Sequence, residues 1–366
     1  MSDIESRTPS NPRARKGRGA VSNTASARFT ALGRELEDDG WASAAAEAEV
    51  SPQTVVAPDH ARRIITRNNS PDLHFDRSIN PYKGCEHGCV YCFARPTHAY
   101  LDLSPGLDFE TRIFAKHDAP ALLRKELAKR GYLPDLVVLG ANTDPYQPVE
   151  RRLEITRGVL EVLAEANHPV TIVTKSALVL RDLDILQTMA GKNLARVMIS
   201  VTTLEREMAR KLEPRAPTPA RRLDAIRELH AGGVPVGVLA APVIPALNDH
   251  ELERILKAAA DHGADCAGYV LLRLPHEIKG LFEEWLETHF PHRKNRVLEM
   301  VRDARGGQLY EAAWGTRMKG RGRYAELIAR RFRLACKKHG LNAERRDLDC
   351  GQFRPPESDA RQMALW

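Results

Sequence analysis

Three closely spaced cysteines are the residues in this sequence best able to do chemistry. Cys85, Cys89 and Cys92 follow a C-x3-C-x2-C spacing. Gly84 and Gly88 lie among them and allow the positive φ angles that a loop around a metal needs. Iron–sulfur cubes are normally held by four cysteines. Three thiolates would hold three irons of a [4Fe–4S] cube and leave the fourth iron open to a cofactor or substrate.

Other uses of these thiols are also open. A zinc ion would need a fourth ligand, which His87 or His98 could supply. The three thiols could also be buried side chains without a ligand. The remaining cysteines are too isolated to form a second cluster and are expected to be buried or free: Cys266, Cys336 and Cys350.

Apolar runs that alternate with amphipathic stretches indicate the elements that must position this loop. Six such runs are typical of buried strands. Helical patterns separate them, with expected caps at Thr218 and Asn248. The alternation favours a parallel sheet covered by helices. Six units rather than eight predict an α/β fold with an open partial (β/α)6 barrel, and a doubly wound sheet is the alternative. The predicted strands are 76–82, 136–140, 170–174, 197–201, 236–241 and 268–272.

Polar side chains follow three of these strands, at the edge where parallel α/β folds place their chemistry. A lysine and a hydroxyl at a strand end suit a ligand carboxylate through charge-assisted hydrogen bonds. Ordinary capped turns would explain the same residues. The polar residues are Asn142, Thr143 and Asp144 after the second strand, Lys175 and Ser176 after the third, and Ser200 at the fourth.

The cysteine spacing, with an aromatic residue before the last cysteine, resembles the signature of radical S-adenosylmethionine (SAM) enzymes. Further stretches resemble the branch of that superfamily related to spore photoproduct lyase, over about residues 60 to 345. Residues 16–20 are similar to an uncharacterised bacterial subgroup of the branch. The stretches that carry the resemblance are 142–148, 174–176, 213–222 and 241–249.

The resemblance implies a [4Fe–4S] cluster held by the three cysteines, with SAM chelating the open iron. An electron from a reductant such as flavodoxin or ferredoxin would split SAM into methionine and a 5′-deoxyadenosyl radical, which abstracts a hydrogen atom. The turn at 142–144 is expected to receive the SAM amino group. Lys175 and Ser176 are expected to bind the SAM carboxylate and Ser200 the ribose. Tyr91 is expected to pack near the adenine or to shield the cluster.

The sequence departs from spore photoproduct lyases at one place. Those enzymes use a cysteine near the end of the second strand as hydrogen-atom donor, whereas residues 139–144 contain none. Tyr146 has a phenolic hydrogen and is the candidate substitute, although packing beside Pro145 and Pro148 is the favoured role. We therefore expect SAM cleavage without efficient repair of the spore photoproduct.

Composition limits the remaining possibilities. The chain has 366 residues, is 43% hydrophobic and carries a net charge of +7. This hydrophobic content can form a proper core, and the charge favours an anionic partner such as nucleic acid or a merely solvated basic surface. No run of about twenty apolar residues occurs, so no membrane span is expected. Unpaired cysteines suit a reducing compartment, and we expect a cytoplasmic protein.

The chain divides into four parts by composition. The first part is rich in Ser, Asn, Arg and Gly and cannot bury enough surface to offset its ordering entropy. The last part contains proline and polar residues and is expected to fray. The predicted parts are a mostly disordered basic and polar tail (1–60), the radical SAM core (61–275), a mostly helical basic C-terminal region (276–348) and a flexible tail (349–366).

A glycine-rich basic loop begins the last predicted helix. This loop and helix could bind the phosphates of nucleic acid, and a soluble helix with a basic outer face is the alternative. Leu327, Ile328 and Ala335 are expected on the inner face of the helix. The basic residues of the loop are Arg317, Lys319, Arg321 and Arg323.

These patterns together predict a radical SAM enzyme whose substrate is open and could be nucleic acid. Modification of RNA or protein by the same radical chemistry is the alternative enzyme hypothesis. A nucleic-acid-binding protein with a structural zinc site is the alternative without catalysis. Polar turns at the strand ends argue against that last hypothesis, because a structural zinc module has no use for a cofactor pocket.

Overall fold

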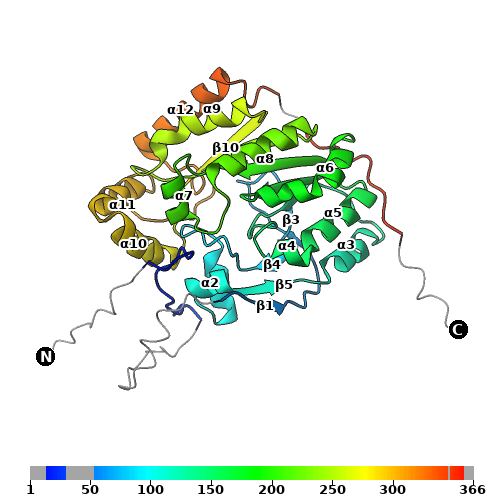
Figure 1. The fold of residues 1–366 in the computed structure, drawn as a ribbon, viewed down its shortest axis with the longest axis horizontal. Coiled ribbons are helices and arrows are strands. Elements are labelled where there is room, and N and C mark those ends of the chain that lie inside the picture. The colour runs from blue at the N-terminus through cyan, green and yellow to red at the C-terminus, as the bar shows by residue number, and fades with distance from the viewer. Residues whose placement is uncertain (1–13, 30–52, 345–346, 358–366) are drawn as a thin grey trace, which may run out of the picture.

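A seven-stranded sheet forms the centre of the computed structural model, which describes residues 14–29, 53–344 and 347–357. Its order is β10-β9-β8-β7-β6-β3-β2 (Figure 1). Neighbours from β3 to β10 are parallel, and β2 pairs with β3 in the antiparallel sense. The strands are β2 (Ile65–Arg67), β3 (Arg77–Ile79), β6 (Val137–Leu139), β7 (Val170–Thr174), β8 (Ala195–Ser200), β9 (Val236–Val243) and β10 (Cys266–Leu271).

The six parallel strands coincide with the six predicted ones, so the partial (β/α)6 barrel is confirmed. Their spatial order follows their sequence order from β3 to β10 without a reversal. A doubly wound sheet would reverse its strand order at a switch point. The alternative architecture is therefore wrong.

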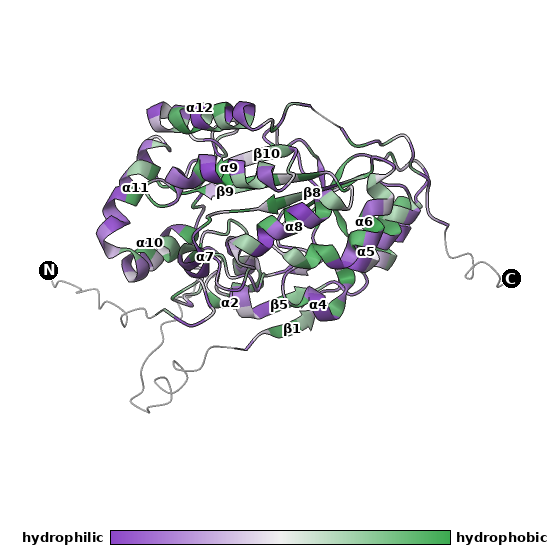
Figure 2. Ribbon diagram, turned by 45° about the horizontal axis from the view of Figure 1, so that its top comes forward, coloured by the Kyte–Doolittle hydropathy of each residue, from purple (hydrophilic) through white to green (hydrophobic). Residues whose placement is uncertain are grey.

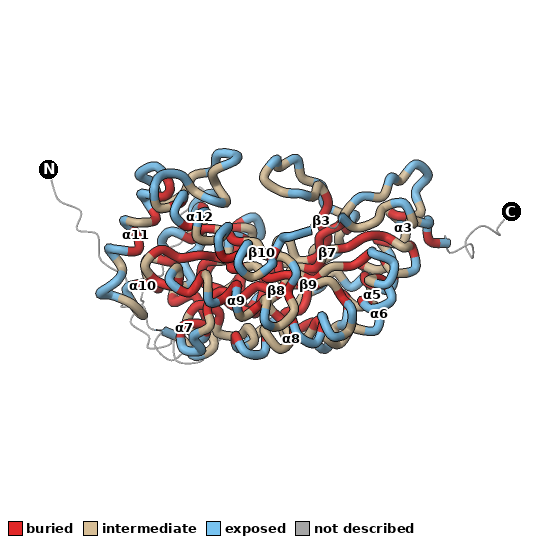
Figure 3. The backbone as a smooth tube through the Cα atoms, turned by 90° about the horizontal axis from the view of Figure 1, so that it is seen from above, coloured by how far each residue is buried: buried red, intermediate tan, exposed pale blue. Residues whose placement is uncertain are grey.

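Helices connect successive parallel strands, because such strands need a long crossover. Figure 2 shows that these helices carry hydrophilic and hydrophobic residues on different faces, and Figure 3 shows the strands as mostly buried. The helix predicted from Thr218 begins at Pro219. The helices of this layer are α3 (Ala119–Leu127), α4 (Glu150–Leu153), α5 (Ile155–Glu165), η2 (Ala177–Asp182), α6 (Leu183–Ala190), α7 (Arg206–Leu212), α8 (Pro219–Ala231), η3 (Asp249–Glu251) and α9 (Leu252–Asp261).

A small unit that contains the cysteine loop is built from residues 55–58 and from the part of the chain between β3 and β6. A three-stranded sheet of order β1-β5-β4 belongs to this unit. Its β1 strand pairs parallel to β5, and β4 pairs antiparallel to β5. The elements are β1 (Val55–Pro58), β4 (Tyr82–Lys83), η1 (Arg95–Leu101), α2 (Leu107–Thr111) and β5 (Arg112–Ala115).

The C-terminal region is helical, as predicted, and it packs onto the main sheet. Ile328 and Ala335 are buried in the same hydrophobic cluster as the strands. Leu327 was expected beside them but is 51% exposed, because it lies about 100° around the helix from Ile328. None of the described helices has the length and apolar character needed to cross a membrane. The helices are α10 (Ile278–His289), η4 (Pro291–Arg293), α11 (Lys294–Asp303) and α12 (Gly322–Lys338).

Two loops join the opposite edges of the main sheet. Asp72, between β2 and β3, accepts a hydrogen bond from the backbone N–H of Gly315 at 2.6 Å. The same carboxylate pairs with Arg317 at 2.6 Å. Gly315 and Arg317 belong to the loop between α11 and α12, in the region of the chain that comes after the opposite edge strand, β10. Side-chain contacts rather than strand pairing therefore span the open side of the partial barrel.

Three described segments within the predicted tails pack against the core, and the rest of those tails lies outside the described residues. Ala20 and Val21 are buried, and residues 55–58 form β1. Near the other end, Asp349 and Arg354 donate backbone hydrogen bonds to the carbonyls of Asn193 and Ala166. Residues 14–29, 53–60 and 349–357 are thus the described parts of the predicted tails that contact the core. Composition missed these segments because hydrogen bonds to distant residues hold them.

Candidate cluster and cofactor site

The cysteine loop is held rigidly at the carboxyl edge of the main sheet. Cys85 and Cys89 are buried and Cys92 is half-buried. Gly84 and Gly88 have φ angles of 79° and 68°, as the loop interpretation predicted. Gln147 fastens the start of the loop: its amide nitrogen donates to the carbonyl of Gly84 at 3.1 Å, and its oxygen accepts the backbone N–H of Glu86 at 2.9 Å.

A buried ion pair supports the loop from behind. Arg95 donates to the carbonyls of Cys89 at 2.8 Å and Gly88 at 3.1 Å. Its guanidinium pairs with Glu110 at 2.5 Å, and both side chains are fully buried. A charge removed from water needs such a partner and such hydrogen bonds to be tolerated. No pattern in the sequence predicted this pair.

The N-terminal strap, residues 14–29, completes this support. The backbone N–H groups of Gly19 and Ala20 donate to the carboxylate of Glu110 at 3.1 and 2.8 Å. Gly19 also lies directly on the cysteine loop, since a Cβ there would be 1.7 Å from the carbonyl oxygen of Gly88. Only glycine fits at this position. The strap is therefore part of the structure that holds the loop.

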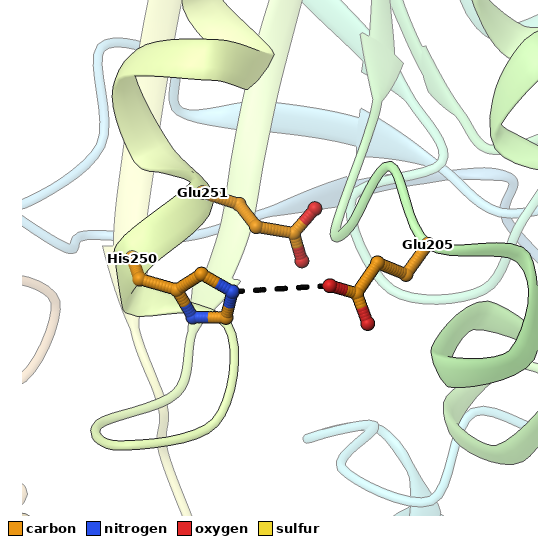
Figure 4. A group of neighbouring side chains, drawn as sticks. All are labelled: Glu205, His250 and Glu251. Atoms are coloured by element: carbon orange, nitrogen blue, oxygen red, sulfur yellow. Dashed lines mark ion pairs between the residues drawn. The ribbon is translucent and has the colours of Figure 1, made fainter.

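The spacing of the thiols fits a cluster better than a single zinc ion. Tetrahedral zinc–sulfur bonds of about 2.3 Å place sulfur ligands about 3.8 Å apart. Among the described residues, the one group of three potential ligand atoms within 4.8 Å of one another is Glu205, His250 and Glu251 (Figure 4). The three cysteine sulfurs are therefore not all within 4.8 Å of one another, which is not the arrangement of ligands around one zinc ion.

Among the described residues, neither proposed histidine forms a group of three potential metal-ligand atoms with the cysteines. His87 lies 3.3 Å from the carboxylate of Asp144 through Nδ1. His98 uses Nε2 to contact the carbonyl of Arg112 at 2.9 Å and packs edge-on against Phe109. The group in Figure 4 does not replace them, because its buried member, Glu251, already accepts hydrogen bonds from Thr203 and Leu204.

Burial and nearby negative charges raise the pKa of two of the thiols, so these groups ionise only when a metal binds. Burial raises the pKa of Cys85 well above its usual value, and Asp144 raises it further. Burial also raises the pKa of Cys89 to about 12, although Lys175 acts in the opposite direction. Thiolates of this kind form when bound iron replaces the proton. The donor set, the burial and the spacing therefore fit a [4Fe–4S] cluster on these three residues.

Two of the polar side chains in the turn after β6 form hydrogen bonds within the protein. Asp144 accepts hydrogen bonds from the hydroxyl of Thr174 at 2.6 Å and the backbone N–H of Lys175 at 2.8 Å. Burial acts to raise the pKa of Asp144, but His87 and these donors outweigh it and lower the pKa to about 2. Thr143 donates to the carbonyl of Tyr82 at 2.7 Å. The two side chains therefore position β7 and the cysteine loop.

Three other predicted residues keep a polar group without a hydrogen-bond partner in the described part of the chain. They are the side-chain amide of Asn142, the ammonium of Lys175 and the hydroxyl of Ser200. Asn142 and Lys175 are half-buried and Ser200 is buried. Ser176 differs, since its hydroxyl accepts the backbone N–H of Leu178 as a helix cap. The capped-turn alternative therefore holds for Ser176.

Lys175 lies at the meeting point of the cysteine loop and β7. Its Nζ is 5.8 Å from the centre of the Tyr91 ring. Removal from water acts to lower the pKa of Lys175, but Cys89 and Glu213 together act more strongly and raise it. The ammonium is therefore charged and faces the loop that carries the thiols.

Glu213 and Arg222 form a second buried ion pair, whose role was not predicted from the sequence. The hydroxyl of Tyr91 donates to Glu213, and Thr202 donates to the same carboxylate at 2.6 Å. Burial acts to raise the pKa of Glu213, but Arg222 and Lys175 lower it to about 2. The pair fixes the tilt of the Tyr91 ring beneath Lys175. The only indication of these two residues in the sequence was that the stretch 213–222 resembles the branch related to spore photoproduct lyase.

Tyr146 is placed for packing. Its side chain is fully buried in the main core. The phenol donates to Asp182 at 3.0 Å, on η2 rather than on the cysteine loop. This agrees with the packing role that was favoured over hydrogen-atom donation.

The four basic residues of the C-terminal loop differ in their availability. Arg317 pairs with Asp72 and stacks 4.1 Å from the centre of the Trp314 ring. Arg321 lies 3.6 Å from Glu311. Lys319 and Arg323 are exposed, and neither has an ion-pair partner in the part of the chain that the structure describes. The predicted phosphate contacts are thus reduced to two freely available cations.

Comparison with known proteins shows the class that this fold and loop define. Residues 79–259 match the family model of the radical SAM superfamily. An uncharacterised protein of Mycobacterium tuberculosis is 38% identical over 294 residues, which are 80% of this chain and 81% of that protein. An uncharacterised protein of Methanocaldococcus jannaschii is 27% identical over 173 residues, 47% of this chain and 62% of that protein. The chain belongs to the radical SAM superfamily.

Solved structures of spore photoproduct lyase share the fold. One variant aligns with a TM-score of 0.58 and 18% identity, covering 80% of this chain and 82% of the other. Another, with bound AdoMet and dinucleoside spore photoproduct, aligns with a TM-score of 0.56 and 17% identity over the same shares. Together with the uncharacterised mycobacterial relative, these matches confirm the resemblance that the sequence indicated.

Proposed function

We propose that this chain is an enzyme that reductively cleaves SAM at a [4Fe–4S] cluster held by Cys85, Cys89 and Cys92. The observation that carries the proposal is the set of three thiols on a rigid loop beside the unpaired ammonium of Lys175. When cluster and SAM are bound, they supply a 5′-deoxyadenosyl radical that abstracts hydrogen from a substrate. The test is anaerobic reconstitution with iron and sulfide, followed by measurement of 5′-deoxyadenosine after reduction.

In this proposal the chain supplies binding, orientation and exclusion of water. Lys175 pairs with the carboxylate of SAM, Asn142 contacts its amino group and Ser200 a ribose hydroxyl. Tyr91, fixed by Glu213, covers the cofactor. Thr143, Asp144 and Ser176 hold these contacts in place instead of touching SAM.

The substrate and partners are also proposals. A nucleic-acid substrate is supported by the basic loop and by the likeness to spore photoproduct lyase. RNA- or protein-modifying radical chemistry would use the same site. The electron donor is a small carrier such as flavodoxin or ferredoxin, and the oxygen-sensitive cluster suits the reducing cytoplasm.

Replacing Lys175 with methionine is expected to weaken SAM binding at least tenfold while iron content stays unchanged. Methionine keeps the side-chain length but cannot pair with a carboxylate, and a charge-assisted hydrogen bond is worth about 1.5–3 kcal/mol. An anaerobic titration of the reconstituted protein measures the affinity. Lys192→Met is the control, since Lys192 is exposed and bonds to Asn167. Equal SAM affinities in the Lys175 variant and the wild type would remove Lys175 from the binding site.

We expect the reconstituted protein to cleave SAM but to repair spore photoproduct poorly. The stretch at the end of β6 lacks the cysteine that would donate hydrogen to the product radical, and Tyr146 bonds to Asp182 in the core. Product analysis with the dinucleoside lesion tests this. Repair over many turnovers would contradict the expectation, and Tyr146→Phe would then show whether the phenol replaces the thiol.

Lys319→Gln combined with Arg323→Gln is expected to make nucleic-acid binding less sensitive to salt. Each phosphate contact adds about 0.7–0.9 to the slope of log affinity against log salt, through released counterions. The double variant should therefore flatten the slope by about 1.5 relative to wild type. Arg317→Gln is the comparison and should change it less, because Asp72 already neutralises Arg317. No measurable binding by the wild type at low salt would return this loop to a solvated surface.

A further inference from the structure

An arginine at the edge of the cluster site has hydrogen-bond donors that the protein does not satisfy. Arg273 follows β10 and places its guanidinium 5.4 Å from the centre of the Phe93 ring, next in sequence to Cys92. Its Nε is buried and has no hydrogen-bond partner in the described part of the protein. One terminal nitrogen donates only to the sulfur of Met318, at 3.2 Å. Thioether sulfur is a weak acceptor, so this guanidinium is poorly satisfied.

The surroundings of Arg273 keep its charge uncompensated. No carboxylate forms an ion pair with it among the described residues. Arg305 lies near enough for the charge of Arg273 to help lower its pKa to about 10, after the larger effect of burial. Nearby acidic groups are engaged elsewhere: Asp72 pairs with Arg317, and Glu311 faces Arg321. A cation in this position favours an anionic ligand.

A loop held by Arg305 connects Arg273 to further basic and aromatic side chains. Arg305 donates to the carbonyls of Leu271 and Leu272 after β10, and also to those of Thr316 and Arg317 at 3.0 and 2.7 Å. The backbone of Met318 accepts a hydrogen bond from Leu271 at 2.9 Å. The loop therefore holds Met318 against Arg273, and Trp314 and Arg317 precede Met318 in the same loop. We call the connected set the aromatic–arginine track: Phe93, Arg273, Met318, Arg317 and Trp314.

The chemistry of the track specifies its ligand. Phe93 is 45% exposed and Trp314 is 54% exposed, and each has a guanidinium over its ring. Aromatic faces that stack bases, interleaved with cations that bind phosphates, are the means by which proteins hold single-stranded nucleic acid. The planar guanidinium of Arg273 matches the two oxygens of a phosphodiester.

We propose that Arg273 binds a phosphate of a single-stranded nucleic-acid substrate, with adjacent bases stacked on Phe93 and Trp314. This inference rests on the proposed function, because it takes the neighbouring cysteine loop to be where the reaction occurs. It goes further by specifying a single-stranded form of that substrate and the residue that binds its phosphate. The phosphate satisfies the orphaned Nε of Arg273 and replaces Met318 as the partner of its terminal nitrogen.

The test compares the wild type with Arg273→Gln in the full-length reconstituted protein. The probe is a fluorescein-labelled oligonucleotide of about 12 nucleotides, within the length that single-strand grooves cover. Fluorescence anisotropy should show at least a tenfold loss of affinity and a salt slope reduced by about one. An oligonucleotide with neutral methylphosphonate linkages should bind wild type and variant equally. Trp314→Ala should weaken binding roughly tenfold with the slope unchanged, through lost stacking.

Two measurements separate ligand binding from packing. Arg330→Gln is the matched control, since Arg330 is exposed on α12, and its affinity should stay within twofold of wild type. The melting temperature of Arg273→Gln should equal or exceed that of wild type, because a buried unsatisfied donor is removed. A fall of more than about 5 °C, which is about 2 kcal/mol or more in a chain of this size, would assign Arg273 to packing and overturn the proposal.

The outcome also separates this inference from the proposed function. Production of 5′-deoxyadenosine is measured on the same wild-type preparation. If the wild type cleaves SAM but Arg273→Gln binds the oligonucleotide within twofold of wild type, the inference about Arg273 is wrong and the proposed function stands. Binding that depends on Arg273 without any SAM cleavage supports the track and overturns the function.

Discussion

Replacing Cys89 with alanine is expected to remove most of the iron and all reductive cleavage of SAM. With two thiolates left, one corner of the proposed cube loses its ligand. Iron per chain and the visible absorbance of the anaerobic protein measure the first effect. Production of 5′-deoxyadenosine measures the second.

The matched control is Cys350→Ala. Cys350 is a half-buried free thiol far along the chain, near Asp135 rather than the cysteine loop. Its removal should leave iron content within about a tenth of wild type. A Cys89→Ala protein with full iron content and activity would show that the ligand assignment is wrong. A colourless wild-type protein containing one zinc per chain would restore the zinc alternative.

Arg95→Met is expected to lower the free energy of unfolding by about 3–5 kcal/mol. Arg95 has a fully buried guanidinium that neutralises Glu110 and donates to the carbonyls of Gly88 and Cys89. Methionine fills similar space but leaves a buried carboxylate unpaired and two loop carbonyls without their donor. Chemical denaturation of the purified apoprotein gives the size of the effect. Iron uptake should fall as well, because the loop loses its support.

A double-mutant cycle identifies the cause of that loss. Arg95→Met combined with Glu110→Gln should be less destabilised than the sum of the two single variants, because no unpaired buried charge remains. Arg112→Met is the control: Arg112 is 59% exposed and 3.5 Å from Asp108, so its pair should contribute at most about 1 kcal/mol. Strictly additive effects of Arg95 and Glu110 would contradict the ion-pair explanation.

The sequence predicted the main sheet well and the small sheet not at all. Each parallel strand is a continuous apolar run because both of its faces are buried, and such runs stand out between helices. By contrast, β1, β4 and β5 have only two to four residues each and no clear periodicity. Asn248 lies at the predicted N-cap position, but its side chain makes no capping hydrogen bond. Its side chain instead accepts from Ile244 and donates to the carbonyl of Thr202, which joins two loops.

The site was predictable where spacing alone determines chemistry. The cysteine motif is local, and its geometry follows from eight residues. The polar turns were harder to assign, because the groups that suit a ligand also suit a protein backbone: Asp144 is saturated by internal donors while Asn142 is not. The ion pairs of Arg95 and Glu213 need contacts between separate segments. Only the folded chain shows which polar residues meet.

The N-terminal strap has a consequence for how the protein is made. Arg28 in the strap donates to Glu277, 249 residues further along the chain. Ribosomes add about 5–20 residues per second, so Glu277 follows Arg28 by roughly 10–50 s. The cysteine loop and its Arg95 clamp are complete in the nascent chain during that delay. The Gly19–Ala20 part of the strap can bind Glu110 early, whereas the Arg28 end is fastened only after Glu277 is made, so translation leaves an interval in which the strap is held at one end.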